Sequence, residues 1–420
     1  MFTSVITKLF LVFLLLKAII QTFLEYRNQK SIVAHYDKVP EQFANKLSLE
    51  DHQKAAEYTL AKIKVGKVSR FISVIILLAW TLGGGLELLN LFILSFDLSE
   101  ISSGVLFIIG FSLISTIIDL PQSYYLTFVL EEKFGFNKTT KKIFFTDMIK
   151  SLSLGLIIGI PIIILLIYLM SYWGQNWWIY AWIAVTSFQF FLMWLYPTFI
   201  APIFNKFSPL EPGEVKTSLE ELFKETDFQN DGLFVMDASK RSAHGNAYFT
   251  GLGKNKRIVV FDTIINTLSP KEVKAILAHE LGHFKKKHII KGLIRSILMG
   301  LIGFYILGIC YQSNLFFYGH GVSTQSSYMA LILFSLVGSV YTFLLTPISS
   351  YISRKYEFEA DEFAAKYTPA SDLVSALINL YKDNASTLTP DKLYSAFYHS
   401  HPPASIRVKF LESLQKVEDK

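Results

Sequence analysis

Residues 270–285 read Pro-Lys-Glu-Val-Lys-Ala-Ile-Leu-Ala-His-Glu-Leu-Gly-His-Phe-Lys. Local signals predict a helix over this stretch. Ser269 suits the N-cap, Pro270 the first helical position, and Glu272 completes a capping box. Four apolar side chains then recur at helical spacing and predict a buried stripe: Val273, Ile276, Leu277 and Leu281.

Within that helix, residues 279–283 read His-Glu-Leu-Gly-His. Residues four apart on a helix lie about 40° apart around its axis, so the imidazoles of His279 and His283 can bind one metal ion. Glu280 points to the side, where it can act on an attacking water. Zinc held by two histidines and a carboxylate keeps a fourth position open, which is the catalytic arrangement. A buried helix that contains two histidines by chance remains an alternative for this motif alone.

A third ligand has to come from another part of the chain. His288 lies nine residues after His279, which on a continuous helix is about the opposite face, so we expect it at the surface or behind the ligands. Glu357 and Asp361 are four apart and share a helix face. We predict that Glu357 binds the metal while Asp361 orients a histidine, whereas Glu359 and Glu362 face solvent. An ordinary charged helix surface is the alternative for this pair.

The composition indicates an integral membrane protein. Of 420 residues, 51% are hydrophobic and 18% are charged, with a mean hydropathy of +0.38, whereas soluble proteins have about 25% charged residues. The single cysteine, Cys310, excludes a disulfide framework. A net charge of +6, with no basic stretch among base-stacking aromatics, argues against nucleic acid as a partner.

Seven apolar segments are long enough to cross a bilayer, which takes about 20 residues. The first is read as a retained helix, because it lacks the basic start and cleavage site of a signal peptide. The predicted spans lie near 4–26, 71–95, 102–130, 151–171, 177–204, 292–312 and 327–349.

Loop charges predict the orientation. The turns at 96–102, 172–176 and 313–326 contain no Lys or Arg, whereas 27–70 holds nine. The positive-inside rule therefore places the basic loops and both halves of the metal site in the cytoplasm.

The chain divides into four predicted segments. Residues 1–204 hold the first five spans, 205–291 a segment with a small sheet and the helix of the two histidines, 292–349 two further spans, and 350–420 the third ligand. Short apolar runs predict strands at 233–236, 247–249 and 257–261, with Gly251 and Gly253 in the turn between the last two. An edge of this small sheet could receive an extended peptide, which makes Ala247 and Tyr248 candidate substrate-binding residues; a plain structural sheet is the alternative.

Several further motifs extend along most of the chain. They are Asp119-Leu-Pro-Gln-Ser-Tyr, Glu131-Glu-Lys-Phe-Gly-Phe-Asn137, Tyr196-Pro-Thr-Phe-Ile-Ala-Pro-Ile-Phe-Asn-Lys206, Asn246-Ala-Tyr-Phe249, Glu357-Phe-Glu-Ala-Asp361 and His401-Pro-Pro403. Together with the histidine motif, they resemble the type I CAAX prenyl proteases, which are intramembrane zinc metalloproteases. The resemblance implies a mainly α membrane protein whose seven-helix barrel encloses a large chamber, with the zinc site and a small sheet at its cytoplasmic end.

The resemblance also implies an activity and a set of roles. Family members cleave near the C-terminus of prenylated proteins, and also cut some membrane-associated peptides without a prenyl group. One Zn²⁺ per chain would be held by His279, His283 and Glu357, with Glu280 as general base. Three residues would contact the substrate backbone or the developing oxyanion: Asn246, His401 and Arg407. From the residues alone, these three could equally be a turn asparagine, a surface-turn histidine and a helix-surface cation.

Two other functions remain open at this point: an HtpX-like quality-control protease, and a transporter or channel with a structural zinc site. We expect a monomer in the bacterial inner membrane or the endoplasmic reticulum. We expect surface positions for three histidines without a role: His244, His320 and His399. Polar residues within the spans indicate either a chamber or a bundle with paired polar groups: Lys17, Glu87, Asp119 and Gln189.

Overall fold

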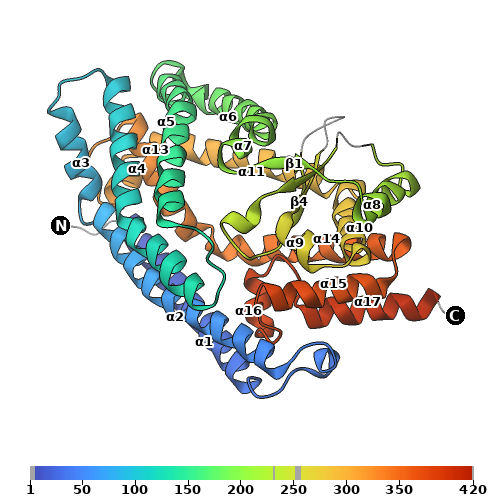
Figure 1. The fold of residues 1–420 in the computed structure, drawn as a ribbon. Helices are drawn as coiled ribbons and strands as arrows, with labels where there is room; N and C mark the ends of the chain where they lie inside the picture. Colours follow the sequence, from blue (N-terminus) through green and yellow to red (C-terminus); the bar gives the residue numbers. More distant parts are fainter. Residues whose placement is uncertain (1–4, 230–231, 251–256, 419–420) are drawn as a thin grey trace.

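The computed structural model describes residues 5–229, 232–250 and 257–418. The long N-terminal helices lie on one side of the molecule, and the sheet with its covering helices lies on the other (Figure 1). The long-helix side comprises α1 (Val5–Ala34), α2 (Leu49–Trp80), α3 (Gly85–Leu94), α4 (Glu100–Tyr125), α5 (Lys141–Tyr172), α6 (Trp177–Leu195), α7 (Ala201–Phe204), α11 (His288–Tyr311), α12 (Asn314–Gly319) and α13 (Ser327–Tyr341). One-turn π-helical segments, Leu126–Glu131 and Tyr196–Ile200, extend α4 and join α6 to α7.

Five of the described helical segments are long and apolar enough to cross a membrane, and there are up to seven spans if each bent pair counts as one. The two bent pairs are α2 with α3, at 48°, and α13 with α14 (Thr346–Tyr367), at 51°. The first bend is made at Gly84, whose positive φ of 79° suits glycine. At most 17% of each apolar window in the five unbroken spans is buried, so most of this apolar surface is left for lipid. Each of the seven predicted spans overlaps one of these segments.

Two of the polar residues within the spans are paired with other segments. The Lys17 ammonium lies 3.3 Å from the Ser339 carbonyl oxygen on α13. The Glu87 carboxylate accepts hydrogen bonds from the hydroxyls of Ser323 and Thr324, at 2.7 and 2.9 Å. At Lys17 and Glu87, the polar residue within an apolar span is therefore explained by a polar partner on another segment.

The expected surface position of His320 is wrong. Its side chain is 1% exposed, because the short helix α12 turns it inward against the ring of Phe10. One ring nitrogen contacts the Phe316 carbonyl oxygen at 2.7 Å and the other the Tyr341 hydroxyl at 2.8 Å. Both polar atoms are thus satisfied, so His320 is a structural residue.

A four-stranded sheet lies in the other half of the molecule, in the order β1-β2-β4-β3. The strands are β1 (Phe207–Pro209), β2 (Leu233–Met236), β3 (Ala247–Thr250) and β4 (Arg257–Phe261). The three predicted strands are confirmed, and β1 is an addition, because three residues that include a proline give no alternating pattern. Strand β3 pairs antiparallel with β4 only, so it forms an edge of the described sheet. Gly251 and Gly253 lie outside the described residues.

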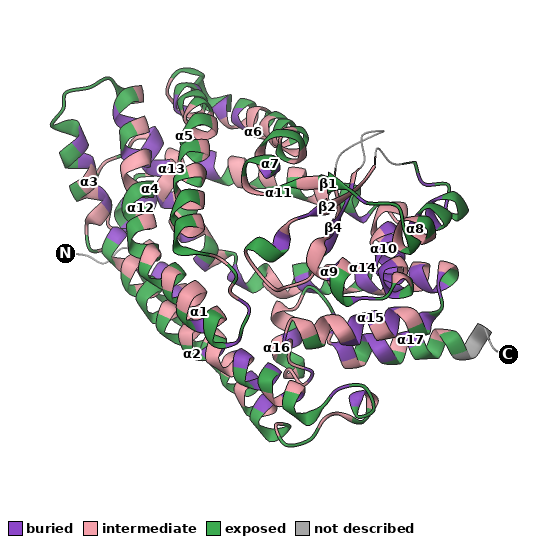
Figure 2. Cartoon of the chain, viewed as in Figure 1, coloured by how far each residue is buried: buried purple, intermediate pink, exposed green. Residues whose placement is uncertain are grey.

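The remaining helices pack around this sheet and around one another. They are α8 (Glu214–Glu225), α9 (Asp262–Thr267), α10 (Pro270–Lys285), α14, α15 (Ala370–Asp383), α16 (Lys392–Tyr398) and α17 (Ala404–Glu418), and short 3₁₀ turns lie at Glu41–Phe43, Gly174–Asn176, Ala238–Lys240 (η5) and Phe343–Leu345. Apolar side chains of α8, α9, α10, α14, α15 and α17 form one continuous core with the sheet. Buried positions are frequent in α10 and α15, and α13 is buried within a second core among the long helices, whose outer sides are largely exposed (Figure 2).

Candidate metal centre

Helix α10 begins where the sequence predicts. Ser269 is the N-cap, its backbone N–H donates to Glu272 Oε2 at 2.8 Å, and both halves of the capping box are present. Glu272 also accepts hydrogen bonds from Ser375 and Asn379 on α15, both at 2.7 Å. Burial raises the pKa of Glu272, but these hydrogen bonds outweigh it and leave the pKa below its usual value. The cap therefore also fixes α10 against α15.

A close helix crossing brings the two halves of the site together. A Cβ atom at Gly282 would lie 2.9 Å from Ala360 Cα and 3.0 Å from the Phe363 Cβ, which is closer than side chains normally approach. Only glycine at this position lets α10 and α14 touch backbone to backbone. Ala360 is fully buried on the facing helix. The crossing places Glu357, one turn before Ala360, beside the two histidines.

The three predicted ligands converge. Nε2 of His279 and Nε2 of His283 are 3.2 Å apart, and the Glu357 carboxylate reaches them at 3.5 and 3.2 Å. One ligand atom from each residue lies within 4.8 Å of the others. Glu357 is 3% exposed, yet its buried Oε2 atom has no hydrogen-bond partner. Two imidazoles and a carboxylate are the donor set of a catalytic zinc site, and a buried carboxylate oxygen without a hydrogen-bond partner can serve as a ligand atom. These residues therefore fit a zinc ion.

Behind the ligands lies a fully buried ion pair. Asp361 is 0% exposed and contacts Nδ1 of His279 at 2.8 Å. Arg407, from α17, donates to both Asp361 oxygens, at 2.9 and 2.5 Å. The predicted face shared by Glu357 and Asp361 is thus found, and its neighbours are a histidine and an arginine instead of solvent.

The charges of this cluster favour a cation between the ligands. Burial and Arg407 oppose protonation of His279, but Asp361 and Glu357 outweigh them and raise the pKa of that imidazole to about 9. Burial alone would raise the pKa of Glu357, whereas His279, His283 and Arg407 together bring it well below its usual range. A site that holds Glu357 ionised and attracts a proton to an imidazole also attracts a metal ion.

Of the two positions expected for His288, the one behind the ligands is found, and the opposite-face argument is wrong. The solvent-facing position of Glu359 is also wrong. His288 is 5% exposed, and its Nδ1 lies 3.0 Å from Nδ1 of His283, while its Nε2 lies 3.0 Å from Glu359. The helical count fails because α10 ends at Lys285 and Lys287 adopts a left-handed conformation, with φ +60°, before α11 begins. If Nε2 of His283 faces the ligand centre, its Nδ1–H donates to His288, which in turn donates to Glu359.

The remaining candidates gather around one cavity of about 330 Å³. Its lining includes the ligand His279 and five further predicted site residues: Asn246, Ala247, Glu280, His401 and Arg407. Glu280 is half-buried and makes no hydrogen bond or ion pair with the described residues. His401, 62% exposed in its side chain, lies 3.3 Å from Glu357. Tyr248 lies on the neighbouring position of β3 and does not line this cavity; burial raises its pKa to about 12.

Sequence reasoning missed one residue that shapes this cavity. Asn384 follows α15, and its side-chain oxygen accepts hydrogen bonds from the Gly245 N–H at 3.1 Å and from His244 at 3.1 Å. It thereby holds the segment that leads into β3. His244 itself stacks on Phe136 at 4.5 Å, and its side chain keeps 34% of its surface exposed; His399 is half-buried. An asparagine just after a helix looks like a cap, so its residue type and position do not predict this contact.

Two family models together match nearly the whole chain. Residues 28–206 match the model described as CAAX prenyl protease N-terminal, five membrane helices. Residues 209–415 match peptidase family M48. The chain belongs to the type I CAAX prenyl protease family.

Individual members of this family are similar over most of their length. CAAX prenyl protease 1 of Saccharomyces cerevisiae is 36% identical over 93% of this chain and 92% of its own. The human CAAX prenyl protease 1 homolog is 35% identical over 76% of this chain and 75% of its own. The crystal structure of S. mikatae Ste24p superposes with a TM-score of 0.91 at 33% identity, covering 98% of this chain and all of that one.

These findings confirm a multi-pass membrane metalloprotease of mainly helical fold. They favour the CAAX protease prediction over the quality-control protease and the transporter. The family implies a metal, and the convergence of His279, His283 and Glu357 supplies a place for it.

Proposed function

We propose that this protein cleaves peptide bonds near the C-terminus of prenylated CAAX proteins, using one Zn²⁺ held by His279, His283 and Glu357. The observation that carries the proposal is the convergence of three ligand atoms within 4.8 Å from two segments far apart in the chain. The substrate class follows from the similarity to CAAX prenyl protease 1 of Saccharomyces cerevisiae. Other membrane-associated peptides are a second substrate class.

The proposed chemistry divides among the residues at the cavity. Bound zinc supplies Lewis acidity, which polarises a carbonyl and makes water a better nucleophile at neutral pH. Glu280, with no competing partner among the described residues, takes the proton of the attacking water and returns it to the leaving amine. Asp361 fixes His279 in the tautomer whose Nε2 faces the ligand centre. His401 and Arg407 stabilise the developing oxyanion from the cavity wall.

The substrate backbone would extend strand β3. This strand has an unpaired side among the described residues, and Asn246 and Ala247 at its start line the catalytic cavity. An extended peptide added at this edge would receive main-chain hydrogen bonds while its scissile bond lies toward Glu280. Tyr248 would contact the same peptide from the neighbouring position.

The proposal includes a placement in the membrane. The catalytic half lies on the cytoplasmic side, because the flanking loops carry the positive charges. The membrane helices enclose a chamber below the site, and the chain acts as a monomer in the endoplasmic reticulum or the bacterial inner membrane.

The test uses the full chain purified in detergent. A panel of farnesylated and unmodified peptides is incubated with it, products are mapped by mass spectrometry, and zinc is measured by elemental analysis. We expect cleavage near the prenylated cysteine, abolished by a chelator and restored by zinc. Glu280→Gln should retain zinc and lose cleavage, whereas Glu357→Ala should lose zinc. Full activity of Glu280→Gln, or unchanged zinc in Glu357→Ala, would refute the assigned roles.

A further inference from the structure

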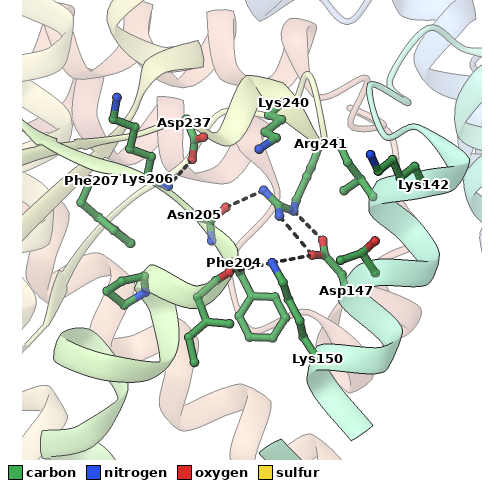
Figure 3. A pocket seen from close by; sticks show the side chains of 14 residues that line it. Lys142, Asp147, Lys150, Phe204, Asn205, Lys206, Phe207, Asp237, Lys240 and Arg241 are labelled. Carbon is green, nitrogen blue, oxygen red and sulfur yellow. Dashed lines mark hydrogen bonds and ion pairs between the residues drawn. The ribbon is translucent and has the colours of Figure 1, made fainter. Parts of the chain in front are cut away.

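A second cavity, of about 670 Å³, lies where two predicted spans end (Figure 3). Its walls come from the first turns of α5, from α7 with the following residues up to Phe207, and from η5 with Arg241. Helix α5 belongs to one candidate span and α7 completes another, Gly174–Phe204. The cavity therefore lies at the boundary between the apolar helices and the catalytic half.

Positive charges outnumber negative ones in this cavity. The cations are Lys142, Lys150, Lys206, Lys240 and Arg241, and the carboxylates are Asp147 and Asp237. Both carboxylates are already engaged. Arg241 donates to Asp147 at 2.9 and 3.3 Å, and the backbone N–H of Lys206 donates to Asp237 at 2.7 Å.

Several of the lysines keep free donors. Lys150 donates to the Ile203 carbonyl oxygen at 2.9 Å, which uses one of its three hydrogens, and its ammonium also pairs with Asp147 at 3.9 Å. The ammonium groups of Lys142, on α5, and Lys240, on η5, make no hydrogen bond or ion pair with described residues. These unpaired cations on two walls of one cavity suit an anion with several acceptor oxygens, such as a phosphate.

The surface next to the basic cavity is apolar. Exposed apolar side chains continue from it along the two spans: Phe145 (40%), Ile149 (61%), Phe199 (53%) and Ile203 (41%). Ile203 and Phe204 also line the cavity itself. A soluble anion would use only the cations, whereas an amphiphile with a phosphate headgroup and acyl chains would use both surfaces.

We propose that this cavity binds the headgroup of an anionic phospholipid from the leaflet next to the catalytic half. The phosphate lies between Lys142 and Lys240, with Lys150 on the membrane side, and the acyl chains lie along Ile149 and Ile203. Arg241, held by Asp147 and Asn205, keeps the wall in place. The site is separate from the metal centre and does not depend on the proposed activity.

The test measures lipid binding to the full chain by native mass spectrometry in detergent. Phosphatidylglycerol and phosphatidylcholine, which share acyl chains and differ in charge, are titrated onto wild type and onto Lys142→Gln/Lys240→Gln. Because each basic residue near anionic lipid contributes roughly a fivefold gain in affinity, the double variant should bind phosphatidylglycerol about 25-fold more weakly. Binding of phosphatidylcholine should not change. The control is Lys46→Gln/Lys271→Gln, which removes two exposed lysines elsewhere and should bind like wild type.

Two results of this titration would overturn the proposal. One is equal affinity of wild type and the double variant for phosphatidylglycerol. The other is displacement of the lipid by millimolar inorganic phosphate, which would indicate a site for a free anion. A photoactivatable phosphatidylglycerol provides a check that needs no variant: its crosslinks on wild type should map to residues 142–150, 202–207 or 237–241, and labelling confined to other segments would also refute the assignment.

Discussion

Replacing Gly282 by alanine tests whether the backbone contact between α10 and α14 assembles the metal site. The added Cβ would lie 2.9 Å from Ala360 Cα, about 0.5 Å short of the 3.4 Å at which ordinary contact begins. Both obstructing atoms of Ala360 belong to the backbone, so no side chain can rotate away. The two helices must therefore separate by about that distance.

The consequence for metal binding follows from the ligand geometry. His279 and His283 lie on α10 and Glu357 lies on α14, so helix separation moves the carboxylate away from both imidazoles. Metal–ligand distances tolerate only about 0.2 Å of deviation. Overpacking of this kind costs about 1–3 kcal/mol. Zinc binding has to restore the close crossing, so this cost is subtracted from the free energy of zinc binding. The affinity for zinc should therefore fall about 5- to 150-fold.

The assay is zinc competition with a fluorescent chelator, together with thermal unfolding before and after metal removal. Gly282→Ala should lose most of the rise in unfolding temperature that zinc gives the wild type, measured for each protein against its own metal-free form. Gly303→Ala is the matched control, because a Cβ at Gly303 on α11 would meet nothing within 4 Å. Wild-type zinc affinity in folded Gly282→Ala would refute the reasoning.

Three further changes test neighbouring parts of the site. In His288→Phe a ring can still stack on Tyr356, which lies 4.1 Å from the His288 ring in the wild type. The phenyl ring cannot accept the hydrogen bond from His283, so zinc affinity should fall about 10- to 100-fold. Unchanged affinity would contradict this arrangement. Glu272→Gln should lower the thermal unfolding temperature at neutral pH, because Glu272 is ionised and hydrogen-bonded there. Since its folded pKa lies below the unfolded value of about 4.3, that stabilisation is present above about pH 4.3 and disappears as the pH falls through the folded pKa; a difference from wild type that stays constant down to pH 3 would exclude this role. Asn384→Ala removes the hydrogen bonds that hold the segment before β3, where the substrate is proposed to bind. KM should therefore rise by a larger factor than zinc affinity falls, and an unaltered KM would contradict the positioning role of Asn384.

The sequence predicted the parts of the site that depend on local periodicity. Spacing within a single helix predicts three features: the cap at Ser269, the shared face of His279 and His283 on α10, and the shared face of Glu357 and Asp361 on α14. The spans were predictable for the same reason, because about 20 consecutive apolar residues suffice to identify one.

The missed features depend on breaks in regular structure or on distant contacts. His288 reaches His283 only because Lys287 adopts a left-handed conformation between α10 and α11. Helical counting assumes that no such break occurs, so it placed His288 on the wrong face. Likewise, Gly282 looks like a neutral position inside the motif, and its role is visible only when Ala360 on the facing helix is known.

The path of the chain couples the metal site to correct membrane insertion. Between His283 on α10 and Glu357 on α14 lie the candidate span α11, the short helix α12 and helix α13, which counts as a span only together with α14. Helix α14 then leaves the direction of α13 at a 51° bend, which carries Glu357 back to the crossing at Gly282. The segment 205–291 by itself therefore contains both histidines but lacks the carboxylate, Asp361 and Arg407. A chain whose last two spans fail to insert as a hairpin would keep the whole histidine motif and still be unable to complete the ligand set.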